Sequence, residues 1–548
     1  MPNSLILHKK FSMVKGFLSV IGLAIFFSFH SCYDKKPSEK SVNTDTIPTK
    51  NTVDKSIPGS FSPPTKIVFD SMQVKIFTDS FPLFAPLQKE LHDFYNNRNY
   101  SFAWFDDKGM IEPADNLYNR IMNIRDEGLP DKILYKSTFA ELMDAEADNR
   151  IPSPKLDLML TAQYISYAKS VWSGLSKKEI TSLDWLLPRK ETPYRELLDS
   201  LLAGKDILKN APVYRQYVLL KKFLLQYNEI QSKAGWPLIK ADKKSYKPGD
   251  SSSTIAQVRQ HLYITGDIAA DNKSSVYDSL LVQSVKAYQK RFGYNETGII
   301  TTTLISEMNI PVEKRIEQII VNMERCRWVP QELKTDHLLV NIPDFRLHVF
   351  EKDSLVFSMN VVVGKNQHKT VIFNGEMKYI VFSPYWNVPS SILKNEILPA
   401  IRRNKNYLAS HNMEWNGGSV RQKPGPNNSL GLVKFLFPNS HSIYLHDTPA
   451  KSLFNEDKRA FSHGCIRLAE PKKLAIYLLR NDPSWTEEKI TEAMNKGKEQ
   501  TVTLSKPIPV FIAYFTSWVD RSGKLNFRND IYNRDSRLAK MILDKPVL

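Results

Sequence analysis

The pattern of apolar and polar positions divides the chain into three regions. In the first, residues 67–235, apolar side chains recur three and four positions apart, as in L-Q-K-E-L-H-D-F-Y and Y-R-Q-Y-V-L-L-K-K-F-L-L. This spacing places apolar side chains on one face of a helix. The region is therefore predicted to be a helical scaffold domain.

Residues 236–315 repeat the helical periodicity in a smaller unit. Two amphipathic segments, T-I-A-Q-V-R-Q-H-L and V-Q-S-V-K-A-Y-Q-K-R-F-G, flank a polar loop, and a third short segment ends at Met308. We expect three short helices around one small core.

From His337 onward the period changes to two, as in L-V-F-S-M-N-V-V-V-G and K-Y-I-V-F-S-P-Y-W-N-V-P. Alternation of β-branched and aromatic residues with polar ones predicts strands. We expect a β-rich domain over residues 316–500, completed by residues 501–548. A helix-and-loop insertion at about 391–437 interrupts it, as lids often do. The predicted fold class is multidomain α+β.

The N-terminus has the pattern of an export signal, residues 1–32. Lysines precede an apolar run over 17–29 that is shorter than the roughly 20 residues needed to span a bilayer. The run ends in F-H-S-C, which resembles a lipoprotein processing site at Cys32. Lipidation of Cys32 and cleavage without lipidation both remain open. Residues 33–66 are rich in Ser, Thr, Pro and Lys and are predicted to be a disordered tether.

Charge narrows the class of partner. The 548 residues carry 75 Lys and Arg against 58 Asp and Glu, a net charge of +17. This balance favours acidic surroundings. Because the sequence contains no zinc-finger spacing and no basic strip interleaved with aromatic residues, an acidic polymer or an anionic membrane surface is expected rather than nucleic acid.

The three cysteines do not form a disulfide framework. If Cys32 is lipidated or removed, only Cys326 and Cys465 remain, and a single bridge between them stays open. Cys326 lies where a helical pattern ends and is expected to be a buried thiol.

Cys465 lies in the polar stretch S-H-G-C, which is not a core pattern. A catalytic cysteine is activated by a neighbouring base or positive field. His463, two residues earlier, points the same way along an extended segment. His446 ends the strand pattern S-I-Y-L-H and can return to the cysteine through a loop. These three residues fall short of the four ligands of a structural zinc site.

The stretches I-Y-L-H-D-T-P and S-H-G-C-I-R-L resemble the signature of L,D-transpeptidases of the YkuD type. R-Q-K-P-G-P-N-N-S-L-G, F-N-E-D-K-R-A-F and P-I-P-V-F-I-A-Y-F resemble the YcbB-like subfamily, in which a scaffold, a peptidoglycan-binding unit and a capped catalytic domain occur in this order. V-R-x-x-L, A-Y-Q-K-R-F-G and T-G-I-I in residues 236–315 resemble a peptidoglycan-binding module. A purely structural three-helix spacer is the alternative for that region.

The resemblance implies a two-step acyl transfer without a metal or organic cofactor. Cys465 attacks the third residue of a peptidoglycan tetrapeptide stem, releases D-Ala and leaves a thioester, which an amine of a second stem converts into a 3→3 cross-link. His446 is implied as the base. Backbone N–H groups near Gly464 and Cys465 are implied to hold the oxyanion.

The resemblance also implies roles for residues around this pair. Arg467 orients carboxylates or forms a structural ion pair, and the role of the motif residue His463 stays open. Residues expected beside the donor groove or in the cap loop are Tyr385, Trp386, Asn387, Lys423 and Asn428.

The same thioester allows other outcomes. Water as acceptor gives an L,D-carboxypeptidase, and a protein lysine gives attachment of a protein to peptidoglycan. A wall-binding lipoprotein without activity is the alternative from another class. In each case the expected location is the periplasmic cell envelope, with the membrane reached through the signal or a lipid anchor.

Overall fold

The computed structural model describes residues 67–146, 152–205, 211–330 and 334–544. The predicted export signal, Cys32 and the predicted tether at 33–66 lie outside the described residues. None of the helices within these described ranges has the length and apolar character needed to cross a membrane.

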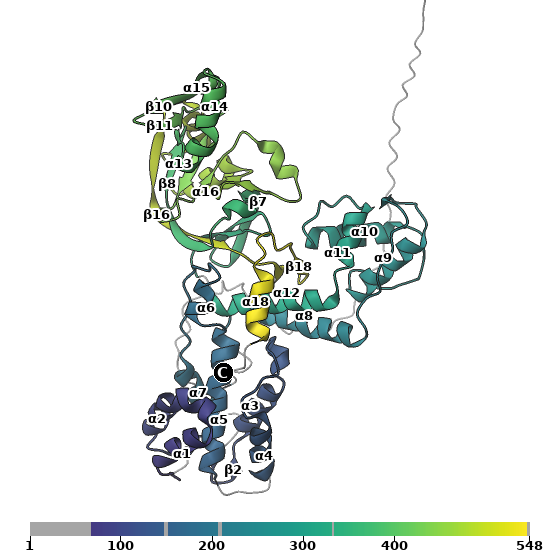
Figure 1. Ribbon diagram of the computed structural model, residues 1–548, viewed down its shortest axis with the longest axis vertical. Coiled ribbons are helices and arrows are strands. Elements are labelled where there is room, and N and C mark those ends of the chain that lie inside the picture. Colours follow the sequence, from purple (N-terminus) through teal and green to yellow (C-terminus); the bar gives the residue numbers. More distant parts are fainter. Residues whose placement is uncertain (1–66, 147–151, 206–210, 331–333, 545–548) are drawn as a thin grey trace, which may run out of the picture. The chain divides into compact units, whose positions relative to one another are not determined.

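The N-terminal part of the described chain is mainly helical (Figure 1). Helix α5 (Pro154–Ala168) is buried on all sides, and the surrounding helices contact it. Apart from Lys155, Asp157 and Gln163, its residues are apolar or carry a hydroxyl group, and a helix that is apolar nearly all round belongs in a core. The elements around it are α1 (Met72–Ser80), η1 (Pro82–Leu87), α2 (Gln88–Asn96), β1 (Phe105–Asp106), β2 (Gly109–Met110), α3 (Glu112–Met122), η2 (Ile124–Glu127), α4 (Lys136–Glu146), η3 (Lys169–Ser173), α6 (Lys177–Thr181) and α7 (Tyr194–Leu202).

A long helix pair flanks the small three-helix unit in the sequence. Helix α8 (Arg215–Ser232) precedes the unit, and α12 (Val312–Trp328) follows it and packs against α8. The unit contains α9 (Ser253–Ile264), α10 (Ser279–Arg291) and α11 (Thr302–Met308), with a two-strand pairing of β3 (Ser245–Tyr246) and β4 (Ile300–Thr301). Each of its helices begins after a side-chain N-cap, namely Ser252, Asp278 and Thr301.

The C-terminal part is built on a nine-stranded mixed sheet with the order β14-β7-β15-β13-β12-β8-β16-β5-β6. Strand β7 pairs through its later residues with β15 and through its earlier ones with β6, so the sheet closes on itself. The fold class is multidomain α+β, as the sequence predicted. The strands are β5 (His337–Asn341), β6 (Arg346–Glu351), β7 (Ser354–Gly364), β8 (Phe373–Phe382), β12 (Val433–Leu436), β13 (Leu445–His446), β14 (Ala460–Ser462), β15 (Ile466–Leu468) and β16 (Gln500–Ala513).

Further short elements surround this sheet. Those of the later sequence are η4 (Asn366–His368), η6 (Lys451–Asn455), α16 (Pro471–Leu479), α17 (Glu487–Asn495), β17 (Ser517–Val519), β18 (Leu525–Phe527) and α18 (Asp535–Leu543).

The capping insertion has a sheet and a core of its own. Strands β10 (Met413–Asn416), β11 (Ser419–Gln422) and β9 (Trp386–Asn387) form a separate sheet. Its core is formed by Val388, Ile397, Met413 and Val420. The intervening helices are α13 (Ser390–Ile392), η5 (Leu393–Ile397), α14 (Leu398–Arg403) and α15 (Tyr407–Ser410).

The insertion differs from the predicted range of about 391–437. It already includes β9, and β12 at its predicted end is a strand of the nine-stranded sheet. Four residues are too few for a clear period-two pattern, so β12 could not be separated from the loop before it.

Candidate active site

Cys465 lies in the tight connection between β14 and β15. Gly464 before it has φ +115, which L side chains rarely adopt. The hydroxyl of Ser462 accepts the Gly464 N–H at 3.1 Å and donates to the Cys465 carbonyl at 2.5 Å. One buried serine therefore fixes the backbone on both sides of the connection.

From the resemblance, backbone N–H groups of both Gly464 and Cys465 were expected to face an oxyanion. The structure directs the Gly464 N–H to Ser462. Among the described residues, the Cys465 N–H has no hydrogen-bond acceptor. The oxyanion donor expected in this connection is therefore Cys465 rather than Gly464.

One row of register partners crosses the sheet next to Cys465. Its members, one from each of six adjacent strands, are Thr501, Val381, Lys434, His446, Arg467 and Val362. Register partners point to the same face of a sheet. Val362 and Val381 are buried but do not belong to the main hydrophobic core. The opposite face of the sheet contacts that core.

Tyr444 and Cys465 lie two residues before His446 and Arg467, so all four side chains belong to this face. The rings of Tyr444 and His446 are 5.7 Å apart between centroids. Tyr444 was not identified from the sequence, although its position two residues before His446 in a strand pattern was a usable signal.

His446 is a buried, neutral imidazole. Its Nδ1 lies 2.5 Å from the carbonyl oxygen of Asp447. Because a carbonyl can only accept, Nδ1 carries the proton and Nε2 keeps its lone pair. Burial, together with the positive charge of Arg467, lowers the pKa of His446 to about 3.

The side chain of Asp447 does not orient His446. It accepts the Leu432 N–H at 2.9 Å and pairs with Lys451 at 2.5 Å. Its backbone carbonyl alone holds the imidazole.

The Cys465 thiol is half-buried and lies 3.7 Å from the Ser442 carbonyl oxygen. Burial raises the pKa of the Cys465 thiol, and hydrogen bonds from Tyr444 and the charge of Arg467 only partly offset this. Burial, followed by the nearby sulfur, also raises the pKa of Tyr444. These shifts describe a neutral thiol on Cys465 and a neutral imidazole on His446.

Arg467 brings an unpaired positive charge to this face. Its Nε is buried and has no hydrogen-bond partner among the described residues, and burial lowers the pKa of its guanidinium. No carboxylate within the described ranges forms an ion pair with Arg467. A structural ion pair, one of its two expected roles, is not formed there.

The side chain of His463 contacts the cap. Its Nε2 lies 3.0 Å from Oε1 of Glu396 in η5, and its ring lies 5.0 Å from that of His368. Burial lowers the pKa of His463 despite the nearby Glu396. His463 therefore links the connection between β14 and β15 to the cap.

The aromatic pair expected beside the donor groove lies at the base of the cap. Trp386 and Asn387 form β9 and pair with Gln422 and Arg421. Trp386 packs partly against the cap core, whereas Asn387 is exposed. Tyr385 is half-buried under the guanidinium of Arg421, 4.2 Å from its ring centroid.

The two residues expected in the cap loop differ in their exposure to solvent. Lys423 is exposed and pairs with Glu414 at 3.1 Å. Asn428 is buried, and its amide donates to the carbonyls of Lys423 at 2.9 Å and Pro384 at 3.1 Å. Its side-chain oxygen accepts the Leu430 N–H, so Asn428 shapes the loop from within.

Cys326 and Cys465 are both free, so the disulfide left open by the sequence is not formed. Cys326 is fully buried, and burial raises the pKa of its thiol to about 12. In the part of the chain that the structure describes, no three His, Cys, Asp or Glu side chains gather as a possible metal-ligand set.

Three family models match the chain in sequence order. They are a scaffold domain at residues 89–224, a "Putative peptidoglycan binding domain" at 251–308, and the YkuD L,D-transpeptidase catalytic domain at 335–489. The last range contains Tyr444, His446, Cys465 and Arg467.

Individual proteins with similar names also match. A "Putative L,D-transpeptidase" of Haemophilus influenzae is 28% identical over 397 residues, which is 68% of this chain and 73% of that protein. The solved L,D-transpeptidase from Mycobacterium smegmatis is 12% identical with a TM-score of 0.19, covering 32% of this chain and 58% of that one. Mycobacterium tuberculosis L,D-transpeptidase 1 is 17% identical with a TM-score of 0.16, covering 33% and 62%. The family-model matches, together with the Haemophilus relative, show that the chain carries a catalytic domain of the YkuD family of L,D-transpeptidases, preceded by a scaffold and a peptidoglycan-binding domain.

Proposed function

We propose that this protein is a peptidoglycan L,D-transpeptidase of the cell envelope that works through a thioester on Cys465. The observation that carries the proposal is the placement of Tyr444, His446, Cys465 and Arg467 on one sheet face. The order of the three family matches is compatible with the YcbB-like subfamily.

In the first step the Cys465 sulfur attacks the carbonyl of the third stem residue, and the thiol proton passes to Nε2 of His446. The carbonyl oxygen becomes an oxyanion, for which the Cys465 N–H is the available backbone donor. When the intermediate collapses, the C–N bond to the terminal D-Ala breaks, and the imidazolium of His446 protonates the leaving amine. A thioester remains on Cys465.

In the second step an amine of a neighbouring stem attacks the thioester, and His446 accepts the proton that this amine loses. Collapse releases the thiolate, which takes the proton back. The product is a 3→3 cross-link. Neutral His446 suits both steps, because its Nε2 lone pair is available before each attack.

Arg467 acts on the charges that form in these steps. A thiolate or a stem carboxylate supplies the negative partner that the guanidinium lacks among the described residues. Tyr385 and Lys423 lie where the cap meets the sheet and are the proposed contacts for the stem peptide, with Trp386, Asn387 and Asn428 holding that region.

The test is mass spectrometry of disaccharide-tetrapeptides incubated with the purified full chain and with Cys465→Ala. Cross-linked dimers lacking one D-Ala, absent with the variant, support the proposal. Tripeptide monomers alone identify an L,D-carboxypeptidase. Labelled lipid on Cys32 in cells, compared with Cys32→Ser, distinguishes a lipid anchor from simple signal cleavage.

A further inference from the structure

The carbonyl of Gly464 is held by a residue from another part of the fold. Thr370 Oγ1 donates to the Gly464 carbonyl oxygen at 2.8 Å, and Thr370 is fully buried. The peptide unit between Gly464 and Cys465 is planar and trans, so its C=O and N–H point in opposite directions. The bond from Thr370 therefore also sets the direction of the Cys465 N–H.

Thr370 is itself held in place by hydrogen bonds to Gly364 and Tyr532. Its hydroxyl accepts the Gly364 N–H at 2.9 Å, while its N–H donates to the hydroxyl oxygen of Tyr532 at 3.1 Å. The Tyr532 hydroxyl donates in turn to the Gly364 carbonyl at 2.6 Å. Tyr532 thus ties together Gly364 and Thr370, the two ends of the loop that contains η4.

The packing around this loop leaves little freedom. A Cβ on Gly364 would lie 2.0 Å from the His368 carbonyl oxygen and 3.1 Å from the Cα of Gly464. The loop and the catalytic connection are therefore in backbone contact, and a shift in one moves the other.

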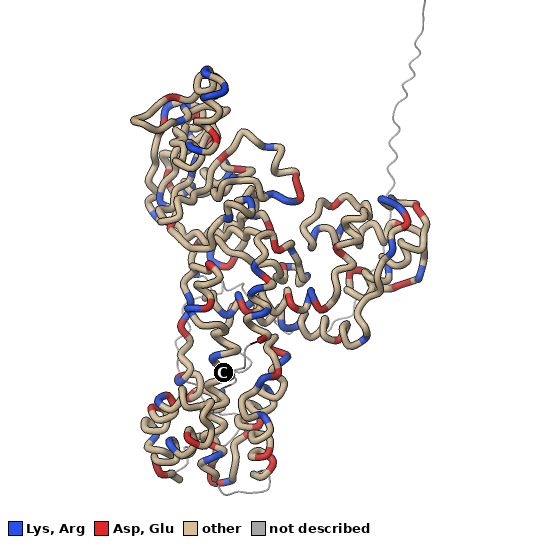
Figure 2. Tube along the Cα trace, viewed as in Figure 1, with Lys and Arg blue, Asp and Glu red and all other residues tan. Residues whose placement is uncertain are grey.

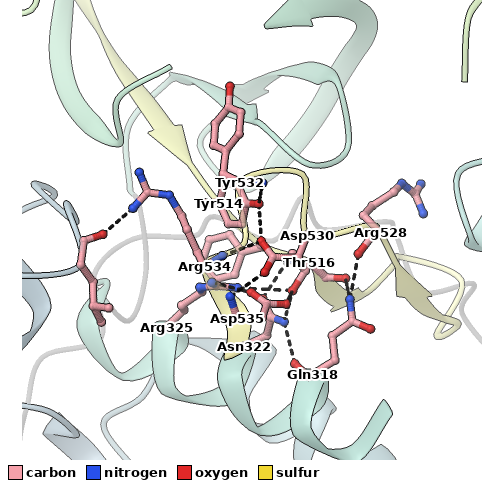
Figure 3. A network of polar contacts seen from close by, with 12 residues as sticks. Gln318, Asn322, Arg325, Tyr514, Thr516, Arg528, Asp530, Tyr532, Arg534 and Asp535 are labelled. Atoms are coloured by element: carbon pink, nitrogen blue, oxygen red, sulfur yellow. Dashed lines mark hydrogen bonds and ion pairs between the residues drawn. The ribbon is translucent and has the colours of Figure 1, made fainter. Parts of the chain in front are cut away.

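Tyr532 is anchored in a buried polar network near the C-terminus (Figure 3). Its N–H donates to the Tyr514 hydroxyl at 2.9 Å, and the two rings stack with centroids 5.6 Å apart. Tyr514 donates to Asp530 at 2.5 Å. Asp535, whose N–H donates to Asp530 at 2.7 Å, pairs with Arg325 of α12 at 2.7 Å.

We infer that Thr370 and Tyr532 are positioning residues for the oxyanion-binding N–H of Cys465. Tyr532 holds Thr370, and Thr370 holds the Gly464–Cys465 peptide in the orientation that acyl transfer needs. The inference rests on the proposed function, because only acyl transfer generates an oxyanion at this place. It assigns part of the catalytic geometry to a segment that follows the sheet in the sequence.

The test uses Thr370→Val, which keeps the shape of the side chain and removes the hydroxyl, together with Thr370→Ser and Tyr532→Phe in the full chain. For each protein, kcat and KM for the disaccharide-tetrapeptide reaction are measured beside the rate at which iodoacetamide alkylates Cys465. Alkylation uses the same sulfur but forms no oxyanion, so it separates loss of oxyanion geometry from loss of the thiol environment.

Thr370→Val is expected to lower kcat about 10- to 100-fold, less than the roughly 100- to 1,000-fold seen when an oxyanion donor is removed outright. KM and the alkylation rate are expected to stay within about twofold of the wild-type values, since neither depends on oxyanion geometry. Thr370→Ser restores most of kcat, and Tyr532→Phe falls between the two.

Two controls match the substitutions. Tyr477→Phe removes from α16 a buried hydroxyl that has no hydrogen-bond partner in the described part of the chain. Thr78→Val removes a buried hydroxyl that bonds to carbonyls of its own helix, α1. Both are expected to keep wild-type kcat.

Three results overturn the inference. In the first, the wild type is active and Thr370→Val has the same kcat as the wild type. Another is an equal fall of acyl transfer and alkylation together with a lowered thermal transition, which indicates a structural role only. If the wild type is alkylated at Cys465 but forms no product from any stem, the proposed function fails, and this inference fails with it.

Discussion

His446 on β13 and Arg467 on β15 are register partners on neighbouring parallel strands, so a buried neutral imidazole and an unpaired guanidinium lie side by side on one face of the sheet. The positive charge of Arg467 lowers the pKa of both His446 and Cys465. Arg467 thus makes the thiol more acidic and the imidazole less basic.

Replacing Arg467 by Met is expected to raise the pKa of Cys465 further, because the charge that partly offsets burial is removed. The pH profile of Cys465 alkylation by iodoacetamide should move to higher pH. Arg467→Lys keeps the charge and should remain close to the wild type. A Met variant whose profile coincides with that of the wild type would show that Arg467 does not act on the sulfur.

The free protein should show a simple pH dependence of alkylation. Because the pKa of Cys465 is raised above its usual value of 9.0, the thiolate fraction increases with pH through and beyond pH 9. A plateau between pH 5 and 8 would instead indicate a thiolate–imidazolium pair. Cys465→Ala supplies the background, which should be very low since Cys326 is fully buried with a pKa of about 12.

His446→Ala should slow acylation about 100- to 10,000-fold, the range in which a positioned acid–base group contributes. Stopped-flow or quenched mass measurements of Cys465 acylation by a carbapenem provide the rate. The pH profile of alkylation should change little, because His446 is neutral in the free protein. His441→Ala, at an exposed position in the same segment, is the matched control. An unchanged acylation rate in His446→Ala would remove this residue as the base.

Glu396→Gln should loosen the cap without weakening the fold. Glu396 and His463 are both partly exposed, and even a fully charged pair at such a position contributes only about 0–1 kcal/mol. The thermal transition should therefore stay in place, while hydrogen exchange over η5 and α14 increases. Lys394→Gln in the same π-helical turn serves as a charge control. Unchanged exchange in Glu396→Gln would show that this contact does not hold the cap.

Lys and Arg occur throughout the described chain, with a group of them where α14 ends and α15 begins (Figure 2). The net charge of +17 led us to expect an acidic polymer or an anionic membrane surface as partner. At the candidate site itself, the half-buried Arg467 has no carboxylate partner within the described residues.

The sequence predicted those parts of the site that are encoded locally. Cys465, Gly464 and His463 are neighbours in one motif, and His446 ends a recognisable strand pattern. The β-rich domain followed from a period of two that extends over many residues. Such patterns can be recognised in the sequence because they involve residues that are close together along the chain.

Other parts depend on contacts between distant segments and could not be predicted. Thr370 and Tyr532 are far apart in the sequence and are brought together at Gly364 by the fold. The Gly464 N–H was expected to face an oxyanion, but the buried hydroxyl of Ser462 accepts it. Asn428 was expected to contact substrate, whereas its side chain bonds to backbone groups of Lys423 and Leu430 and to the distant Pro384 carbonyl.

The most direct test of the account is intact and fragment mass spectrometry of the full chain mixed with disaccharide-tetrapeptides, beside Cys465→Ala. The account predicts a transient adduct on Cys465 equal to the stem minus D-Ala, followed by 3→3 cross-linked dimers, with neither species in the variant. Cross-linked product from Cys465→Ala, or an adduct on a different residue, would contradict it.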